Sequence, residues 1–232
     1  MKRFGCIAPS VIQLPWDLHK LLPSGVQANV VTLNVRNGLP GEQERALASL
    51  RGASDVLIDE GAAAITMLGV PVAARRGFAA EHAALEALTA DRGAVPILSS
   101  LAASVLAFQR LAVKHPLLIT QYNDEVNAKI MAYMRDAGLP AVGAIGLGAT
   151  NAAQVNALTP SDFRALARQA LDRHPSADGI FLSARGNLLE LSLELEVALG
   201  LPVTDQIQAT TWWSLSQLGV AAAPGGGRLL SS

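Results

Sequence analysis

Short apolar runs alternate with amphipathic stretches along the chain, and this alternation limits the possible folds more than any other feature. In the first part of the chain, strands are expected at residues 4–8, 28–33, 62–68 and 95–98, and helices at 42–60, 76–90 and 101–113. Turn residues separate them, as at Asn37 to Gly41 and at Gly69, Val70 and Pro71. Strands that alternate with helices are typical of parallel βαβ units, so the sequence predicts an α/β protein.

The pattern restarts after His115 and Pro116. Strands are expected at 117–120, 141–145, 179–183 and 202–204, and helices at 124–137, 163–173, 188–199 and 206–218. The stretch from 146 to 151 contains two glycines and is expected to be a loop, and the tail from 221 to 227 consists of Ala, Pro and Gly and is expected to be coil. We therefore predict two similar α/β halves, one of residues 1–113 plus 207–232 and the other of residues 114–206.

Composition narrows the class of protein. The chain is 50% hydrophobic with a mean hydropathy of +0.32, which suits parallel strands buried on both faces. No apolar run reaches the roughly 18 residues of a membrane span, and the N-terminus lacks a signal-peptide pattern. A net charge of −1 without a basic patch argues against nucleic acid as a partner. With one cysteine and no Cys/His cluster of ligand spacing, we expect a cytoplasmic protein without metal or disulfide.

A functional site is expected at the carboxyl ends of the strands, where α/β proteins bind their ligands. The strand exits predicted to face each other there are 9–10, 69–71, 99–100, 121–123, 183–186 and 204–206. The exit at 183–186 runs into a helix expected to open at Asn187, whose free amides and dipole would favour an anion. Its central residue, Ala184, can perform no acid–base chemistry.

Each candidate side chain could have a functional role or a purely structural one, and the residues alone do not decide between the two. Tyr122 is a strong hydrogen-bond donor or a packed residue with its hydroxyl in water. Asn123 could contact a ligand or cap the next helix, and Arg185 could bind a carboxylate or lie in solvent. Cys6, inside the first strand, is expected to be an inert small hydrophobe. The adjacent tryptophans 212 and 213 leave a homodimer open.

Several short motifs carry a resemblance that covers nearly the whole chain. They are Gly61-Ala62-Ala63-Ala64, Met67-Leu68-Gly69, Arg76-Gly77, Tyr122-Asn123-Asp124-Glu125-Val126-Asn127, the run from Ser176 to Ser183, the run from Glu196 to Val203, and Ala209-Thr210-Thr211-Trp212. In their residues and in their order along the chain, these motifs resemble the aspartate/glutamate racemase superfamily, in particular the branch of arylmalonate decarboxylase and maleate cis–trans isomerase. The resemblance implies two flavodoxin-like halves related by a pseudo-two-fold axis, a site in the cleft between them, and no cofactor.

The resemblance also implies roles for individual positions. Racemases and maleate isomerases of this superfamily use one cysteine from each half, and the decarboxylases keep only the second. Gly69 stands at the first of these positions and Ala184 at the second, so both thiols are missing here. Tyr122 would donate to an oxyanion, with Ser183 beside it. The remaining expected substrate contacts are Pro9, Ser10, Val70, Pro71, Ser99, Asn123, Arg185 and Gly186.

Three hypotheses follow for the function. The first is a cofactor-free lyase or isomerase that acts on a small carboxylic acid through an enolate-like intermediate, with decarboxylation as the best single reaction. The second is a catalytically silent homologue that binds carboxylates. The third is a maleate isomerase or decarboxylase type of enzyme disabled by a cysteine-to-alanine change at Ala184. The sequence does not identify the substrate.

Overall fold

Two four-stranded parallel sheets form the framework of the protein. A computed structural model describes residues 1–9, 16–34, 42–91, 93 and 95–231. The first sheet has the order β2-β1-β3-β4 and the second the order β6-β5-β7-β8, so both halves share one topology. The strands are β1 (Lys2–Ala8), β2 (Val26–Thr32), β3 (Ile65–Met67), β4 (Ile97–Ser99), β5 (Pro116–Thr120), β6 (Gly143–Gly146), β7 (Gly179–Ser183) and β8 (Val203–Asp205). The predicted α/β fold with two flavodoxin-like halves is confirmed.

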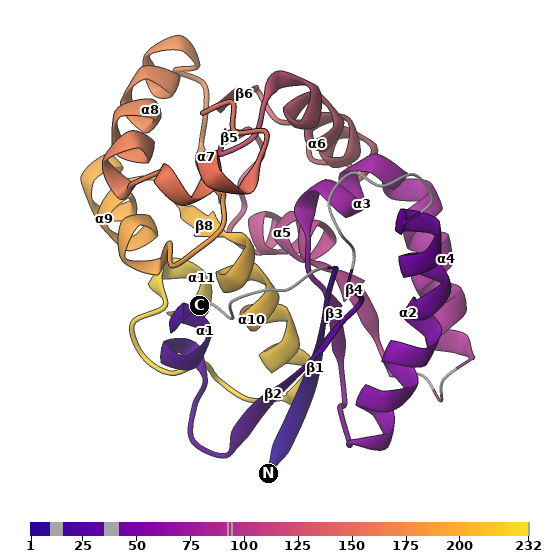
Figure 1. The fold of residues 1–232 in the computed structure, drawn as a ribbon. Helices are drawn as coiled ribbons and strands as arrows, with labels where there is room; N and C mark the ends of the chain where they lie inside the picture. The colour runs from indigo at the N-terminus through magenta and orange to yellow at the C-terminus, as the bar shows by residue number, and fades with distance from the viewer. Residues whose placement is uncertain (10–15, 35–41, 92, 94, 232) are drawn as a thin grey trace.

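Helices cover both sheets (Figure 1). They are α1 (Trp16–Leu21), α2 (Glu42–Asp59), α3 (Val70–Arg76), α4 (Phe78–Ala90), α5 (Ser100–Arg110), α6 (Asp124–Asp136), α7 (Ala152–Ala157), α8 (Pro160–Arg173), α9 (Leu189–Leu199), α10 (Gln206–Leu218) and α11 (Gly227–Ser231). The buried strands β5 and β7 pair in register from Pro116 and Gly179 to Thr120 and Ser183. Residues 121 and 184, which directly follow these two strands, therefore lie side by side at the carboxyl-terminal end of the second sheet.

The structure corrects the predicted boundaries at several places. Val70 and Pro71 do not form an exit turn but begin α3, where the fixed φ of proline suits the first helical turn. The helix predicted at 76–90 is interrupted at Gly77, whose φ of 75° ends α3 and starts α4. Helix α7 begins directly after the predicted loop, and α11 begins at the end of the predicted coil tail. The predicted turn at 37–41 lies outside the described residues.

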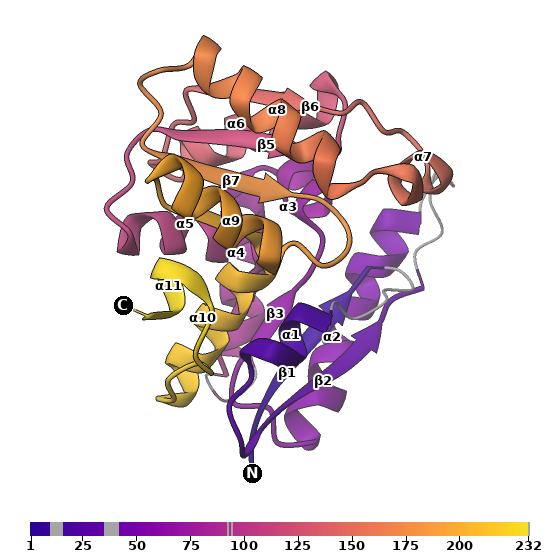
Figure 2. The ribbon, with the colours of Figure 1, turned by 90° about the vertical axis from the view of Figure 1, so that its left-hand side faces the viewer.

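One hydrophobic core is shared by the two halves. It joins residues of α3 and α5, such as Ala73 and Phe108, to residues of α6 and β7, such as Ile130 and Phe181. Helix α10 follows β8 of the second sheet, yet its Trp213 packs with Phe4 of β1. Figure 2 shows the second sheet with α8 and α9 in the upper part of the molecule and β1 and β2 in the lower part. The exact limits predicted for the halves, after 113 and after 206, stay a prediction.

Two further features bear on the class of protein. Among the described helices, none is both long and apolar enough to cross a membrane. Cys6 is buried in β1, and burial raises the pKa of its thiol to about 11. A thiol with so high a pKa is a poor nucleophile at neutral pH, which agrees with the structural reading of this residue.

Candidate functional site

The turn after β7 is held in place by two glutamines. Ala184 is 3% exposed, and its carbonyl accepts a hydrogen bond from Nε2 of Gln206, the first residue of α10, at 3.1 Å. The backbone N–H of the exposed Arg185 donates to Oε1 of Gln121 at 2.8 Å. Gln121 follows β5 and is itself buried. The two strand exits at the centre of the second sheet are therefore fastened to each other.

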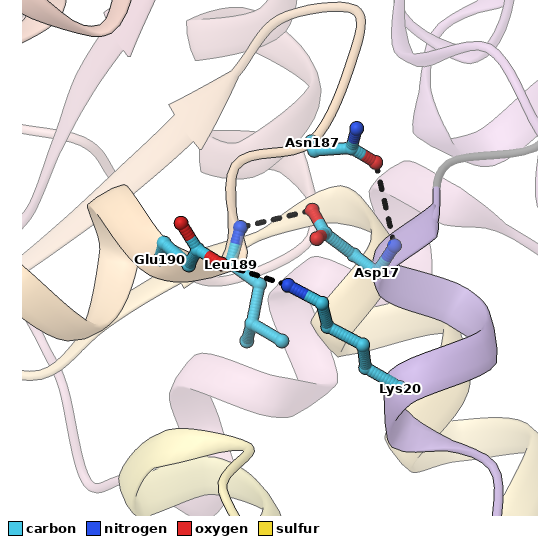
Figure 3. A network of polar contacts seen from close by, with 5 residues as sticks. All are labelled: Asp17, Lys20, Asn187, Leu189 and Glu190. Carbon is cyan, nitrogen blue, oxygen red and sulfur yellow. Dashed lines mark hydrogen bonds and ion pairs between the residues drawn. The ribbon is translucent and has the colours of Figure 1, made fainter.

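The helix after this turn begins later than predicted, and its first amide is already occupied. Helix α9 starts at Leu189 rather than at Asn187. The N–H of Leu189 donates to Oδ2 of Asp17 at 2.9 Å, and the N–H of Asp17 donates to Oδ1 of Asn187 at 3.3 Å. An exposed ion pair between Lys20 and Glu190 lies next to these contacts (Figure 3). The anion expected at this helix N-terminus is thus, at least in part, the protein's own buried Asp17 carboxylate.

Tyr122 lies close to Ser183 and Arg185. Burial raises the pKa of the Tyr122 phenol above its ordinary value, and the nearby Ser183 hydroxyl and the Arg185 guanidinium oppose this rise. The Ser183 hydroxyl is buried and has no well-aligned hydrogen-bond partner within the described part of the chain. The Tyr122 phenol, the buried Ser183 hydroxyl and the Arg185 guanidinium therefore gather at the ends of β5 and β7.

Two other predicted contact residues have structural partners. The side chain of Asn123 accepts the N–H of Val126 at 3.1 Å and caps α6, which is the plain reading of this residue. The Ser99 hydroxyl donates to Oε2 of Glu81 at 2.8 Å and accepts the N–H of Ala102 at 3.1 Å. Ser99 is fully buried, so a ligand would have to compete for its hydroxyl.

A second group of predicted residues gathers at the end of β3. Gly69 has a φ of 105°, and a Cβ atom added to it would lie 3.0 Å from Cγ of Pro9. A side chain at this position would meet both backbone strain and crowding. Val70 is fully buried in the first turn of α3, and Pro71 is half-buried. Ser10, the remaining predicted contact, lies outside the described residues.

A cavity of about 170 Å³ adjoins the turn after β7. It takes in three predicted residues, Ala184, Arg185 and Gly186. Sequence reasoning missed the rest of its wall, which consists of Gln121, Val155, Leu158, Thr159, Pro160, Phe163, Asn187 and Leu188. Gln121 stood in a predicted strand exit, but an amide carries no titratable group that would single it out. The residues of α7 and α8 lack any local signal, since the tertiary fold alone brings them here.

The described part of the chain offers individual polar and charged side chains at this site and no cluster of metal-ligating ones. Among residues 1–9, 16–34, 42–91, 93 and 95–231, no three His, Cys, Asp or Glu side chains gather as they would around a metal ion. The described residues offer hydrogen-bond donation by Tyr122 and Ser183 and the positive charge of Arg185, and Gln121, Thr159 and Asn187 add polar side chains to the cavity wall.

Comparison with known proteins identifies the family to which the chain belongs. A family model described as arylmalonate decarboxylase matches residues 5–230. The chain belongs to the arylmalonate decarboxylase family. An arylmalonate decarboxylase from Bordetella bronchiseptica is 31% identical over 173 residues, which are 73% of this chain and 72% of that protein.

Solved structures of the arylmalonate decarboxylase family superpose on the whole chain. Unliganded arylmalonate decarboxylase has a TM-score of 0.87 and 25% identity, with 100% of both chains covered. A double mutant of that enzyme in its liganded form has a TM-score of 0.89 and 26% identity, with 99% of both chains covered. Maleate cis–trans isomerase from Nocardia farcinica, bound to TRIS, shares the fold at a TM-score of 0.84 and 21% identity, with 99% of this chain and 98% of that chain covered. The predicted resemblance is confirmed.

Proposed function

We propose that this chain is a cofactor-free lyase that decarboxylates a small substituted malonate through an enolate-like intermediate. Membership of the arylmalonate decarboxylase family supports the reaction class. The observation that carries the proposal is the Tyr122 phenol beside the buried Ser183 hydroxyl and the Arg185 guanidinium. These groups could bind a carboxylate and stabilise the negative charge that develops when carbon dioxide leaves.

The reaction would proceed in two steps. In the first, the bond between the α-carbon and one carboxylate breaks, carbon dioxide leaves, and the electron pair passes into the other carboxylate to form an enediolate. Tyr122 and Ser183 would donate hydrogen bonds to its oxygens, while Arg185 would hold the substrate through its charge. In the second step a proton returns to the α-carbon and gives a monocarboxylic acid.

The raised pKa of Tyr122 suits the role of donor. Because burial disfavours the phenolate, the hydroxyl keeps its proton at neutral pH and is available to an oxyanion. Losing carbon dioxide is also easier where a carboxylate leaves water for an apolar surface. Val70 and Pro71 are the residues that we propose for this surface, together with Ala184.

The proton that returns to carbon must come from a group other than a thiol. Ala184 and Gly69 have no side chain that could hold it, and the thiol of Cys6 is buried in β1. We assign this step to water, delivered to the site beside Tyr122, or to the Tyr122 hydroxyl itself.

The missing thiols favour one other function, that of a silent carboxylate-binding homologue. Such a protein would keep Arg185, Tyr122 and the cavity beside the turn but would leave its ligand unchanged. It differs from the lyase in a single measurable property, which is turnover.

Carbon dioxide release from phenylmalonate, measured alongside calorimetric binding, tests both functions. We expect turnover by the natural chain and a loss of about 100-fold in Tyr122→Phe, the usual cost of removing one oxyanion donor. Ala184→Cys serves as the comparison that restores the family thiol. Binding by the natural chain with turnover only in Ala184→Cys would establish the silent homologue instead. If neither chain binds or converts a panel of substituted malonates and maleate, both functions are wrong.

A further inference from the structure

We propose that Asp17 is a positioning residue of the candidate site, which it serves by holding the turn that carries Ala184 and Arg185. Asp17 belongs to α1, the short helix between β1 and β2 of the first half. The turn belongs to the second half, more than 160 residues further along the chain. The effect of Asp17 on turnover rests on the proposed function, whereas its effect on the turn does not.

Asp17 contacts the residues on both sides of Leu188. Its carboxylate Oδ2 accepts the N–H of Leu189 at 2.9 Å, and its own N–H donates to Oδ1 of Asn187 at 3.3 Å. Figure 3 shows both contacts, which run from α1 to the beginning of α9. Because Asp17 is only 2% exposed, its carboxylate meets little competition from water for this amide.

The remaining part of the turn has its own anchors. Gln121 accepts the N–H of Arg185, and Gln206 donates to the carbonyl of Ala184. The turn is thus fastened at its start by residues that follow β5 and β8 and at its end by Asp17. If the last anchor is lost, residues 186–188 join the fixed start of the turn to a helix end that can move.

A buried acid at this place is unfavourable for stability, which argues that its position matters. Asp205, the cap of α10, is also buried, and the charge of Asp17 adds to the rise in the pKa of Asp205. Two buried carboxylates that repel each other cost stability. The positive end of the α9 dipole offsets part of this cost at Asp17, since an anion there lies at the helix N-terminus.

Three variants separate the hydrogen bond from the charge and from the nearby ion pair. Asp17→Leu has a similar size and no acceptor, whereas Asp17→Asn keeps an oxygen for the Leu189 amide. Glu190→Gln is the matched control, because it breaks the exposed Lys20–Glu190 pair and leaves Asp17 intact. For each chain we would measure hydrogen exchange along the backbone, together with kcat and KM for phenylmalonate.

We expect a local and specific effect. In Asp17→Leu, amides 186–189 should exchange about tenfold faster, while the Arg185 amide, which Gln121 accepts, and the amides of β5 and β7 keep their protection. The kcat for phenylmalonate should fall about tenfold with KM changed by less than about twofold, because a displaced turn harms the reacting geometry more than binding. Asp17→Asn should recover most of both properties, and Glu190→Gln should match the natural chain.

Other outcomes would overturn the proposal. Faster exchange along the whole chain in Asp17→Leu would show that Asp17 only stabilises the fold. Unchanged exchange at 186–189 would show that Asp17 does not hold the turn. Faster local exchange with unchanged kcat would show that the held turn does not matter to the reaction. If the natural chain releases no carbon dioxide, the proposed function fails, and phenylmalonate affinity replaces kcat in the same comparison. An affinity equal in Asp17→Leu and the natural chain would then count against the positioning role.

Discussion

At the scale of single residues, Gly146 shows how closely β6 packs against the strand exit that carries Tyr122. A Cβ atom added to Gly146 would lie 1.9 Å from the carbonyl oxygen of Tyr122 and 2.6 Å from Nδ2 of Asn127. The first contact is with backbone, so the backbone itself would have to move. We therefore predict that Gly146→Ala lowers the free energy of unfolding by about 2 kcal/mol.

Gly52 provides the matched control for Gly146. It lies in α2, where an added Cβ would meet no atom within 4 Å. Gly52→Ala should raise the free energy of unfolding by about 0.5 to 1 kcal/mol, because alanine is the better helix former. Urea unfolding of both variants tests this contrast, and an equal effect of the two changes would refute the packing argument.

Sequence reasoning at this scale succeeded where the signal was local. Asn123 precedes a helical pattern directly, and its capping role could be predicted from that position. Asp17 and Gln121 could not be found in this way, because their partners in the turn lie 172 and 64 positions away. A hydrogen bond between such distant residues depends on how the two halves pack, and no spacing in the sequence records that.

At the scale of elements, the N-terminus of α10 predicts a pH dependence. Oδ1 of Asp205 accepts the N–H groups of Ile207 and Gln208, and burial raises the pKa of this carboxyl from 3.8 to about 6. The folded protein therefore binds the proton more tightly than the unfolded chain. Between about pH 4 and pH 6 the contribution of Asp205 to stability must fall as the pH rises.

Asp205→Asn isolates this contribution, because asparagine is an equally good cap and does not titrate. We expect the free energy of unfolding of the natural chain, relative to that of the variant, to be about 2 kcal/mol greater at pH 4.5 than at pH 7. Urea unfolding of both chains at the two pH values measures the difference. A difference that does not change with pH would mean that Asp205 titrates normally.

Element prediction from the sequence worked best for long periodic segments. The predicted helix at 206–218 has the observed bounds of α10, since a capping residue and a glycine mark its two ends. Helix α3 was missed because Gly69, Val70 and Pro71 were expected to form a turn, whereas a proline is equally compatible with the first turn of a helix. The short helices α7 and α11 were missed because so few residues give no clear period.

At the scale of the whole molecule, the shared core indicates that the two halves unfold together. Glu81 of α4 adds a polar link to that core. Its Oε2 accepts hydrogen bonds from Ser99 of the first half and from the Tyr133 hydroxyl of α6 in the second. Glu81 is 1% exposed, and burial raises the pKa of its carboxyl. A buried carboxyl that depends on both halves ties the stability of each half to the other.

Tyr133→Phe removes the part of this link that comes from the second half. We predict a loss of about 2 kcal/mol in the free energy of unfolding, because a buried carboxyl oxygen loses a hydrogen-bond donor. Unfolding should remain a single transition, with tryptophan fluorescence and far-ultraviolet circular dichroism changing at the same urea concentration. Separate transitions for the two probes would show that the halves are independent.

Tyr122→Phe is the matched comparison for Tyr133→Phe. We expect the Tyr122 hydroxyl to matter for turnover and the Tyr133 hydroxyl to matter for stability. The Tyr122 hydroxyl lies beside Ser183 at the candidate site. Its removal should change the free energy of unfolding by less than about 1 kcal/mol while it abolishes most carbon dioxide release. Tyr133→Phe, measured at a temperature where it is fully folded, should retain most of its turnover. If Tyr122→Phe instead destabilised the chain as much as Tyr133→Phe does, any loss of turnover in it would follow from the fold and not from the chemistry of the site.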